Sequence, residues 1–243
     1  MTETLWKRRL ETIEELVDEE TRGLADIGYD HAYLLEALAT RPEISVLIGV
    51  EIQRAAHRRV QERLPDLLGK LDLRHGDGLM PLTAGEIDTA VIAGVGELKI
   101  LQMLDKAPIL AASLRRLIVC PANFKGVIRT GLNSRGWRCI DEGLARERGH
   151  YYPAMVYERG EEQLTEPLDF LGPHLAKHLP VHMRVYLEFL EKRYKAAIRA
   201  GVGPSTGSDL RDEGRRAFIH TIEQIGPALD VLRGNPSPSR HRL

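Results

Sequence analysis

The chain has 243 residues, and its 34 Lys and Arg residues against 35 Asp and Glu residues leave a formal net charge of −1. This balance excludes a protein that is basic overall, so any contact with nucleic acid must come from local basic patches. The length suffices for one large domain, or for an ordinary domain with an appendage.

The chain has two cysteines, Cys120 and Cys139. They are too few for a disulfide framework or a cysteine zinc site, so we expect two buried thiols in a reducing compartment. The N-terminus has no apolar core of signal-peptide length, and no stretch approaches the length and hydropathy of a membrane-spanning helix. The sequence therefore predicts a soluble, cytoplasmic protein without membrane contact.

The chain opens with apolar residues at helical spacing, which predict an amphipathic helix before the first strand. These residues are Leu5, Leu10, Ile13, Leu16 and Val17. The neighbouring Arg8 and Arg9 are candidates for RNA contact. A solvated basic turn is the alternative interpretation.

The first strand, expected at 24–27, contains Asp26 and runs into Gly28 and Asp30. Gly28 allows a ligand close to the backbone, and the first helical N–H groups near Asp30 and His31 are expected to point at that ligand. Acids at such a turn repel the phosphates of a dinucleotide but attract an amino group and a sulfonium. The pattern therefore favours S-adenosylmethionine over NAD, with a tight turn and a solvated Asp as the alternative.

Two further acids follow the next two strands, which are expected at 44–50 and 71–74. Glu51 can accept hydrogen bonds from both hydroxyls of a cofactor ribose, and Asp77 can accept one from an adenine amino group. A helix-capping acid and an Asp-Gly turn are the respective alternatives. Three acids at the ends of three consecutive strands together predict a cofactor site at that edge of a sheet.

The fourth and fifth strands, expected at 87–93 and 114–120, end in loops that should face the transferred group. After the fifth strand, Asn123 can hydrogen-bond the edge of a base and Phe124 can stack on one. A turn residue and core packing are the alternatives for these two side chains.

A class I methyltransferase fold accounts for the order of the elements. Helices are expected at 33–40, 53–64, 98–104 and 125–134, and two antiparallel strands at 137–144 and 151–157. Five parallel strands followed by an antiparallel pair make a seven-stranded α/β sheet of Rossmann-like type. A NAD-binding domain would instead continue with another crossover helix.

The pattern changes after residue 160 to two amphipathic helical stretches, which predict an antiparallel coiled-coil hairpin. We expect a cofactor domain at 1–160, a helical hairpin at 161–234 and a disordered tail at 235–243. The hairpin carries an excess of basic residues, including Arg184, Lys192, Arg193 and Lys195. They are candidates for holding an RNA backbone, and a solvated helix face is the alternative.

Three histidines, His174, His178 and His182, fall at a spacing that would suit a metal on one helix. Pro180 interrupts that helix, and no carboxylate completes the set. We therefore expect no metal site.

The motifs together resemble those of the bacterial tRNA (adenine-22-N1)-methyltransferase family over nearly the whole chain. The matching stretches are Arg8-Arg9-Leu10, Asp26 to Leu35 with its Asp-His-Ala-Tyr run, Gly76 to Leu79, Ala93 to Glu97, Cys120 to Asn123 with one insertion, and Gly172-Pro173. The resemblance implies methylation of an adenine N1 in tRNA, at position 22, with S-adenosylmethionine as cofactor. The expected partner is tRNA, and the expected state is a monomer or weak dimer.

The residue patterns and the family resemblance together predict a role for each candidate residue. Catalysis is assigned to Asp30, which would support the charge developing on the base, and to Asn123, which would orient it. The cofactor-binding candidates are Asp26, Gly28, Asp30, His31, Tyr33, Glu51, Ile52, Gly76, Asp77, Gly78, Ala93, Gly94 and Gly96. The RNA-binding candidates are Arg8, Arg9, Phe124, Arg184, Lys192, Arg193 and Lys195.

The chain departs from the family pattern at four positions. Tyr29 stands for Ser, Leu35 for Pro, Glu97 for Gly and Cys120 for Gln. Tyr29 and Glu97 are expected to add bulk or charge where cofactor and base meet. The departures leave two alternatives open: a methyltransferase of a different RNA or of a small molecule, and a non-catalytic RNA-binding relative.

Overall fold

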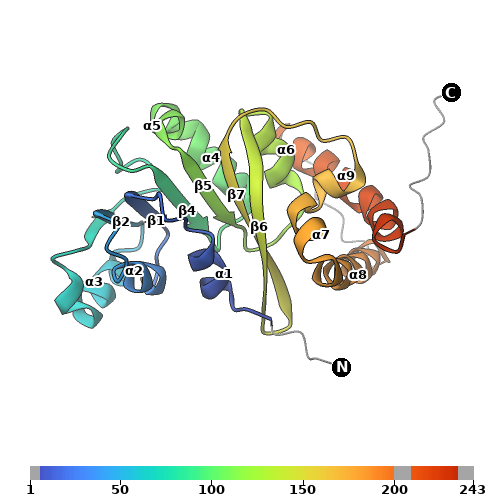
Figure 1. Ribbon diagram of the computed structural model, residues 1–243. Coiled ribbons are helices and arrows are strands. Elements are labelled where there is room, and N and C mark those ends of the chain that lie inside the picture. The colour runs from blue at the N-terminus through green and yellow to red at the C-terminus, as the bar shows by residue number, and fades with distance from the viewer. Residues whose placement is uncertain (1–5, 200–208, 235–243) are drawn as a thin grey trace. The chain divides into compact units, whose positions relative to one another are not determined.

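The computed structural model describes residues 6–199 and 209–234 (Figure 1). The chain divides into two compact units, one made of 1–123 and 137–160 and the other of 124–136 and the residues from 161 on. The stretch 124–136, which the sequence groups with the cofactor domain, clusters with the second unit. The predicted disordered tail at 235–243 lies outside the described residues.

The first unit is built on a seven-stranded sheet with the strand order β3-β2-β1-β4-β5-β7-β6. The strands are β1 (Gly23–Ile27), β2 (Val46–Glu51), β3 (Asp72–His75), β4 (Thr89–Ala93), β5 (Arg116–Cys120), β6 (Trp137–Glu147) and β7 (His150–Arg159). The first five are parallel, β7 is antiparallel to β5, and β6 is antiparallel to β7. The predicted Rossmann-like methyltransferase sheet is confirmed.

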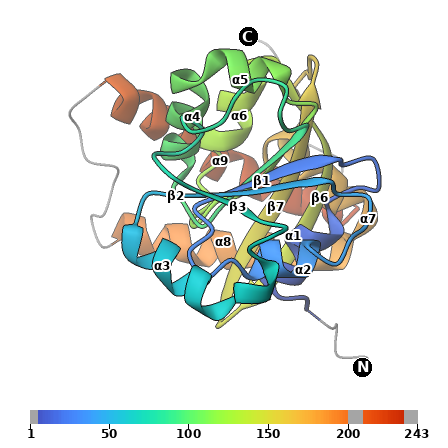
Figure 2. The same ribbon diagram turned by 90° about the vertical axis from the view of Figure 1, so that its left-hand side faces the viewer.

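Helices cover both faces of this sheet, with α1, α2 and α3 on one face and α4 and α5 on the other (Figure 2). Their bounds are α1 (Arg9–Glu15), α2 (Tyr33–Leu38), α3 (Arg54–Arg63), α4 (Glu97–Lys106) and α5 (Pro108–Ser113), and a 3₁₀ turn η1 (Pro65–Leu67) follows α3. Because helices cover both faces, all five residues of β1 are buried, as in other parallel sheets. The short α5 was not expected from the sequence, where Pro108 at its first position was the available start signal.

The second unit is helical. It contains α6 (Val127–Asn133), η2 (Pro167–Phe170), α7 (Pro173–His178), α8 (Pro180–Arg199) and α9 (Asp209–Leu232). Helices α8 and α9 pack together, and Arg233, just after α9, lies 3.7 Å from Glu188 in the first half of α8. The two helices therefore run antiparallel, as the sequence predicts.

The three histidines considered for a metal site lie on two helices, because α7 ends at His178 and α8 begins at Pro180. Within 6–199 and 209–234, no three His, Cys, Asp or Glu side chains gather as metal ligands would. None of the helices in the same ranges is both long and apolar enough to span a membrane.

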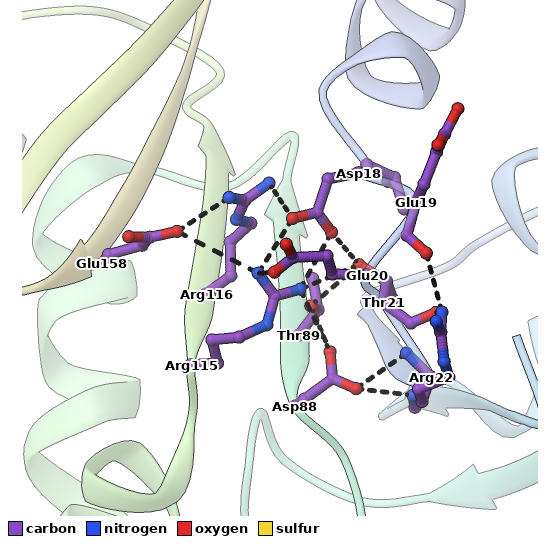
Figure 3. Close-up of polar contacts among 12 residues, drawn as sticks. Asp18, Glu19, Glu20, Thr21, Arg22, Asp88, Thr89, Arg115, Arg116 and Glu158 are labelled. Atoms are coloured by element: carbon purple, nitrogen blue, oxygen red, sulfur yellow. Dashed lines mark hydrogen bonds and ion pairs between the residues drawn. The ribbon is translucent and has the colours of Figure 1, made fainter. Parts of the chain in front are cut away.

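An ion-pair network joins the amino-terminal edge of the parallel strands (Figure 3). Arg115 donates to both oxygens of Asp18 at 2.8 and 2.9 Å, and Arg116 lies 2.7 Å from both Asp18 and Glu158. The Asp88 carboxylate accepts from the backbone N–H groups of Arg22 and Gly23, where β1 begins. The network thus ties the starts of β1, β4 and β5 to the end of β7, opposite the edge where the predicted site residues lie.

Replacing Asp18 by Asn should destabilise the protein by about 2 kcal/mol at pH 7. Burial opposes its charge, but the hydrogen bonds from Arg115 and Thr21 and the charge of Arg116 lower the pKa of Asp18 to about 2. Since this lies below the ordinary value of 3.8, the stabilisation is present above about pH 4 and is lost as the pH falls toward 2. Urea unfolding of both proteins measures it.

Asp66→Asn is the matched control, because Asp66 is exposed on η1. Its unfolding free energy should stay within about 0.5 kcal/mol of the wild type. Equal stability of Asp18→Asn and wild type at pH 7 would show that the network contributes nothing.

Candidate cofactor and active site

The loops that follow the parallel strands are tied to the ends of neighbouring strands. Gly28 N donates to Val50 O at 2.8 Å, and Gly76 N donates to Glu51 O at 3.1 Å. On the other side of β1, Gly94 N donates to Cys120 O at 2.9 Å. The loops therefore gather at one edge of the sheet, where a doubly wound fold binds its ligand.

Two buried carboxylates lie at the centre of this edge. Asp26 is 6% exposed and Glu51 is 5% exposed. Burial, together with the negative charge of Glu51, raises the pKa of Asp26 to about 7. Glu51 accepts from Asp30 N at 3.2 Å and from Gln53 N at 2.8 Å, so it also fixes the loop after β1. The pair gives the site concentrated negative charge, which suits a cationic ligand.

The loop after β1 contains three residues in the left-handed region: Gly28 (φ 80°), Asp30 (φ 45°) and Ala32 (φ 56°). A side chain at Gly28 would meet no heavy atom within 4 Å, so the space beside it is open. This space and the adjacent carboxylates fit a ligand with positive charge. The expectation that Asp30 N–H points at the ligand is wrong, because that group donates to Glu51.

Tyr29 does not add bulk to the ligand side of the loop, contrary to the expectation from the sequence. Its ring is 5% exposed in the hydrophobic core, and its hydroxyl lies 2.9 Å from Nδ1 of His57. Gly49 on β2 makes room for this ring, since a Cβ there would lie 2.7 Å from Tyr29 Cδ1. Burial, together with Glu51 and Asp26, raises the pKa of Tyr29 to about 12.

Two other departures from the family pattern are also buried. Glu97 is the first residue of α4 and is 4% exposed. Cys120 ends β5 with no exposed surface, and burial raises the pKa of its thiol to about 12. Cys120 packs in the hydrophobic core, whereas burial alone does not separate Glu97 from the ligand, because Asp26 and Glu51 are about equally buried.

Asp30, His31 and Tyr33 face helix α3. The exposed Asp30 carboxylate accepts from His31 Nδ1 at 2.8 Å and from Arg59 Nη2 at 3.2 Å. The His31 ring stacks on Tyr33 with centroids 5.6 Å apart, and Arg63 lies 4.8 Å from the Tyr33 centroid. The sequence did not single out Arg59 and Arg63, although their helix is visibly rich in arginine.

The loop after β3 holds Asp77 in reach of two lysines of α4. Asp77 accepts from Lys99 and Lys106, each at 3.2 Å. The hydrogen bonds from Lys106 and Lys99 lower the pKa of Asp77, so its carboxylate is ionised as an acceptor must be. Ile52, just after β2, is 57% exposed, and its carbonyl oxygen accepts from His75 Nε2 at 3.0 Å.

Glycines shape the other two loops at this edge. A Cβ on Gly76 would lie 2.2 Å from Pro81, and Gly78 takes a positive φ of 58° beside Met103. Ala93 ends β4, Gly94 takes a φ of 75°, and Gly96 caps α4. The expected cofactor-binding residues therefore lie at the carboxyl ends of β1, β2 and β4, in the loops that follow β1 to β4 or, for Tyr33, at the start of α2.

The acceptor and RNA candidates separate into exposed and buried side chains. Asn123 is exposed after β5, whereas Phe124 is 7% exposed and lies 6.4 Å from the Tyr186 ring, which is the core-packing alternative. Arg8 is exposed at the start of α1. The basic residues of α8 are all exposed: Arg184, Lys192, Arg193 and Lys195.

Arg9 Nη1 lies 3.7 Å from the position that a Cβ on Gly94 would take, and its guanidinium lies 5.3 Å from the centroid of Tyr152 on β7. Arg9 therefore connects the loop after β4 with the β6–β7 hairpin. The sequence proposed Arg9 for RNA contact but gave no signal for Tyr152, because the pairing depends on the register of a strand far along the chain.

Replacing Asp26 by Asn should stabilise the ligand-free protein at pH 8 by up to about 4 kcal/mol. The pKa of Asp26 is raised from 3.8 to about 7, so ionisation costs the folded state stability as the pH rises through that window. Asn mimics the neutral form and removes this cost. Urea unfolding at pH 8 and at pH 4 measures the gain, which should nearly vanish at pH 4.

Glu161→Gln is the control, since Glu161 is exposed and should show no such pH dependence. A less stable Asp26→Asn protein at pH 8 would contradict a raised pKa at this position.

Comparison with known proteins agrees with this geometry. Residues 6–155 match the family described as a methyltransferase domain. The tRNA (adenine(22)-N(1))-methyltransferase of Bacillus subtilis (strain 168) is 32% identical over 188 residues, which cover 73% of this chain and 77% of the relative.

Solved structures of the same kind share the fold. The Bacillus subtilis M1A22 tRNA methyltransferase TrmK has a TM-score of 0.72 at 26% identity, covering 93% of this chain and 99% of that one. M. capricolum TrmK in complex with S-adenosyl-homocysteine has a TM-score of 0.73 at 20% identity, with coverage of 93% and 99%. The chain belongs to the methyltransferase family that includes the tRNA (adenine(22)-N(1))-methyltransferase of Bacillus subtilis.

Proposed function

We propose that this protein is an S-adenosylmethionine-dependent methyltransferase that modifies N1 of an adenine in tRNA, at position 22. The observation that carries the proposal is the buried Asp26–Glu51 pair beside the open space at Gly28. The activity in the name of the Bacillus subtilis relative supports the substrate and the position. A cytoplasmic location is part of the proposal, and a tRNA substrate supports it.

Each cofactor-binding acid is proposed to contact a different part of S-adenosylmethionine. Ionised Asp26 attracts the positive charge of S-adenosylmethionine, and the lone pairs left on Glu51 can accept from ribose hydroxyls. Asp77 can accept from an adenine amino group after its lysine contacts, which are exposed and individually weak, are released. Bound S-adenosylmethionine supplies the electrophilic methyl group that an adenine N1 attacks.

The protein contributes position and charge to this transfer rather than a covalent intermediate. Asn123 is exposed after β5 and can hydrogen-bond the edge of the base. Asp30 can stabilise the positive charge that methylation creates, once it leaves Arg59 and His31. Both contacts are on the surface, so releasing them costs little.

The exposed cations of α8 are the proposed contacts of the second unit with the tRNA backbone. Arg184, Lys192, Arg193 and Lys195 are all exposed, and Lys195 lies 2.8 Å from Glu191. Cations of this kind contribute affinity without reading sequence.

The structure of residues 6–199 and 209–234 adds no support to the alternatives that the sequence left open. The alternative of a different substrate was suggested by Tyr29, Glu97 and Cys120. All three side chains are buried, and those of Tyr29 and Cys120 pack in the hydrophobic core.

Glu51→Gln should weaken S-adenosylmethionine binding by roughly tenfold to a hundredfold, because a hydrogen bond to a charged acceptor contributes about 1.5–3 kcal/mol. Titration calorimetry measures the affinity.

The wild-type protein should also methylate a tRNA transcript that has adenine at position 22, and should not methylate a transcript that has guanine there. Mass analysis of the nucleosides from both transcripts measures this difference.

Glu161→Gln again serves as the control and should bind the cofactor like the wild type. A folded wild-type protein without cofactor binding would overturn the enzyme assignment. Equal methylation of both transcripts would overturn only the assignment of position 22 as the methylated nucleotide, and the methyltransferase assignment would stand.

Asn123→Ala and Asp30→Asn should each lower kcat by roughly tenfold to a hundredfold, because the first removes a hydrogen bond to the base and the second removes the charge that stabilises the methylated base. Asn123→Ala should leave the cofactor affinity unchanged. Single-turnover methylation of the tRNA transcript measures the rate, and calorimetry measures the cofactor affinity. Asp66→Asn is the matched control. An unchanged methylation rate in Asp30→Asn would rule out a catalytic role for Asp30 and leave it only its surface contacts with His31 and Arg59.

A further inference from the structure

The β6–β7 hairpin extends beyond the carboxyl ends of the parallel strands. Val119 pairs with Met155, so the part of β7 before Met155 continues past Cys120, the last residue of β5. Figure 1 shows the two strands continuing together to their turn. The hairpin tip therefore lies on the same edge of the sheet as the cofactor and acceptor loops.

The tip is a tight turn that displays a basic residue. Glu147 pairs with His150, which leaves the two-residue loop Arg148-Gly149, with φ values of 48° and 79°. Two positive φ values in a two-residue loop define a type I′ turn, whose twist matches that of the strands. The turn holds the exposed Arg148 at the end of the hairpin.

The N-terminal segment is fixed to this hairpin. Arg146 N donates to Lys7 O at 3.1 Å, and the Trp6 and Tyr151 rings meet edge to face with centroids 5.1 Å apart. The Arg146 guanidinium lies 5.9 Å from the Trp6 centroid and 5.5 Å from that of Tyr151. Cations and aromatic rings from two distant parts of the sequence thus form one cluster.

Arg9 makes the cluster continuous with the loop after β4. Its guanidinium lies over Tyr152, next to Tyr151 in the sequence, while its Nη1 approaches Gly94. We name Trp6, Arg9, Arg146, Arg148, Tyr151 and Tyr152 the hairpin-tip surface.

The composition of this surface matches RNA. Residues 6–9 and 146–152 together hold five Lys or Arg residues, one Glu and three aromatic residues, in a chain whose net charge is −1. Cations bind phosphates, and aromatic rings stack on bases that have left a helix. A base that is methylated at N1 must be unpaired at that edge, so nucleotides beside it are available to such a surface.

We propose that the hairpin-tip surface binds the backbone and an unstacked base of the tRNA next to the adenine that is methylated. The inference deepens the proposed function and rests on it. The hairpin gives the first unit its own RNA contact, independent of the basic residues of α8.

Stabilisation of the hairpin is the competing role for the cation–ring contacts, each of which contributes about 0.5–1 kcal/mol at an exposed site. Arg148 separates the two roles, because the cation–ring contacts within this surface are made by Arg146 and Arg9 instead. Its replacement changes the charge of the tip and leaves the cluster in place.

The test measures binding of a fluorescent tRNA transcript by Arg148→Glu over about 50 to 200 mM salt. The dissociation constant should rise roughly fivefold to tenfold, and the slope of log affinity against log salt should become shallower by about 1. Lys70→Glu is the matched control, because Lys70 is exposed and precedes β3 at the opposite edge of the sheet. It should bind tRNA within about twofold of the wild type.

Tyr151→Leu tests the stacking contribution. It should weaken binding without changing the salt slope, because it removes a ring but no charge. Thermal unfolding of each variant verifies that the hairpin is intact.

Wild-type affinity and salt slope in Arg148→Glu, with methylation by the wild type intact, would overturn the hairpin proposal and leave the enzyme assignment standing. If Arg148→Glu weakens tRNA binding in a protein that binds no S-adenosylmethionine, the surface is supported and the methyltransferase assignment fails.

Discussion

The site depends on the burial of two carboxylates, Asp26 and Glu51, at the ends of neighbouring strands. Placing both there is unfavourable in the absence of a ligand, as the raised pKa of Asp26 records. Glu51 offsets part of the cost by accepting two backbone N–H groups, one of them from the cofactor loop. A bound cation relieves the repulsion, so the stability given up by the free protein becomes affinity for the ligand.

The opposite edge of the same sheet supplies stabilisation that the ligand edge lacks. There Asp18, Asp88 and Glu158 have cationic or backbone N–H partners, and the pKa of Asp18 is lowered rather than raised. The pKa values of Asp18 and Asp26, at opposite edges of one sheet, therefore shift in opposite directions. Stability concentrated where the strands begin allows the loops where they end to be shaped by function.

Much of this was predictable because the relevant signals are local. Acids and glycines directly after buried strands identified the site edge, and the order of strands identified the fold. The side-chain direction of Tyr29 was not predictable, because the space it fills is created by Gly49 on another strand. Phe124 is a similar case: its neighbour Tyr186 comes from a helix more than sixty residues along the chain. Packing partners of this kind carry no signature in either local sequence.

The same reasoning explains why departures from a motif are weak indicators of altered function here. Tyr29 replaces a small residue, yet its ring turns into the core and leaves Gly28 with open space on the ligand side. The direction of a side chain, and not its size or charge alone, decides whether it reaches the ligand. Conversely, Arg146 and Tyr151 belong to no motif, but strand register brings them to the edge where ligands bind. Position on the sheet is therefore a better guide to function in this chain than similarity of the motif residue itself.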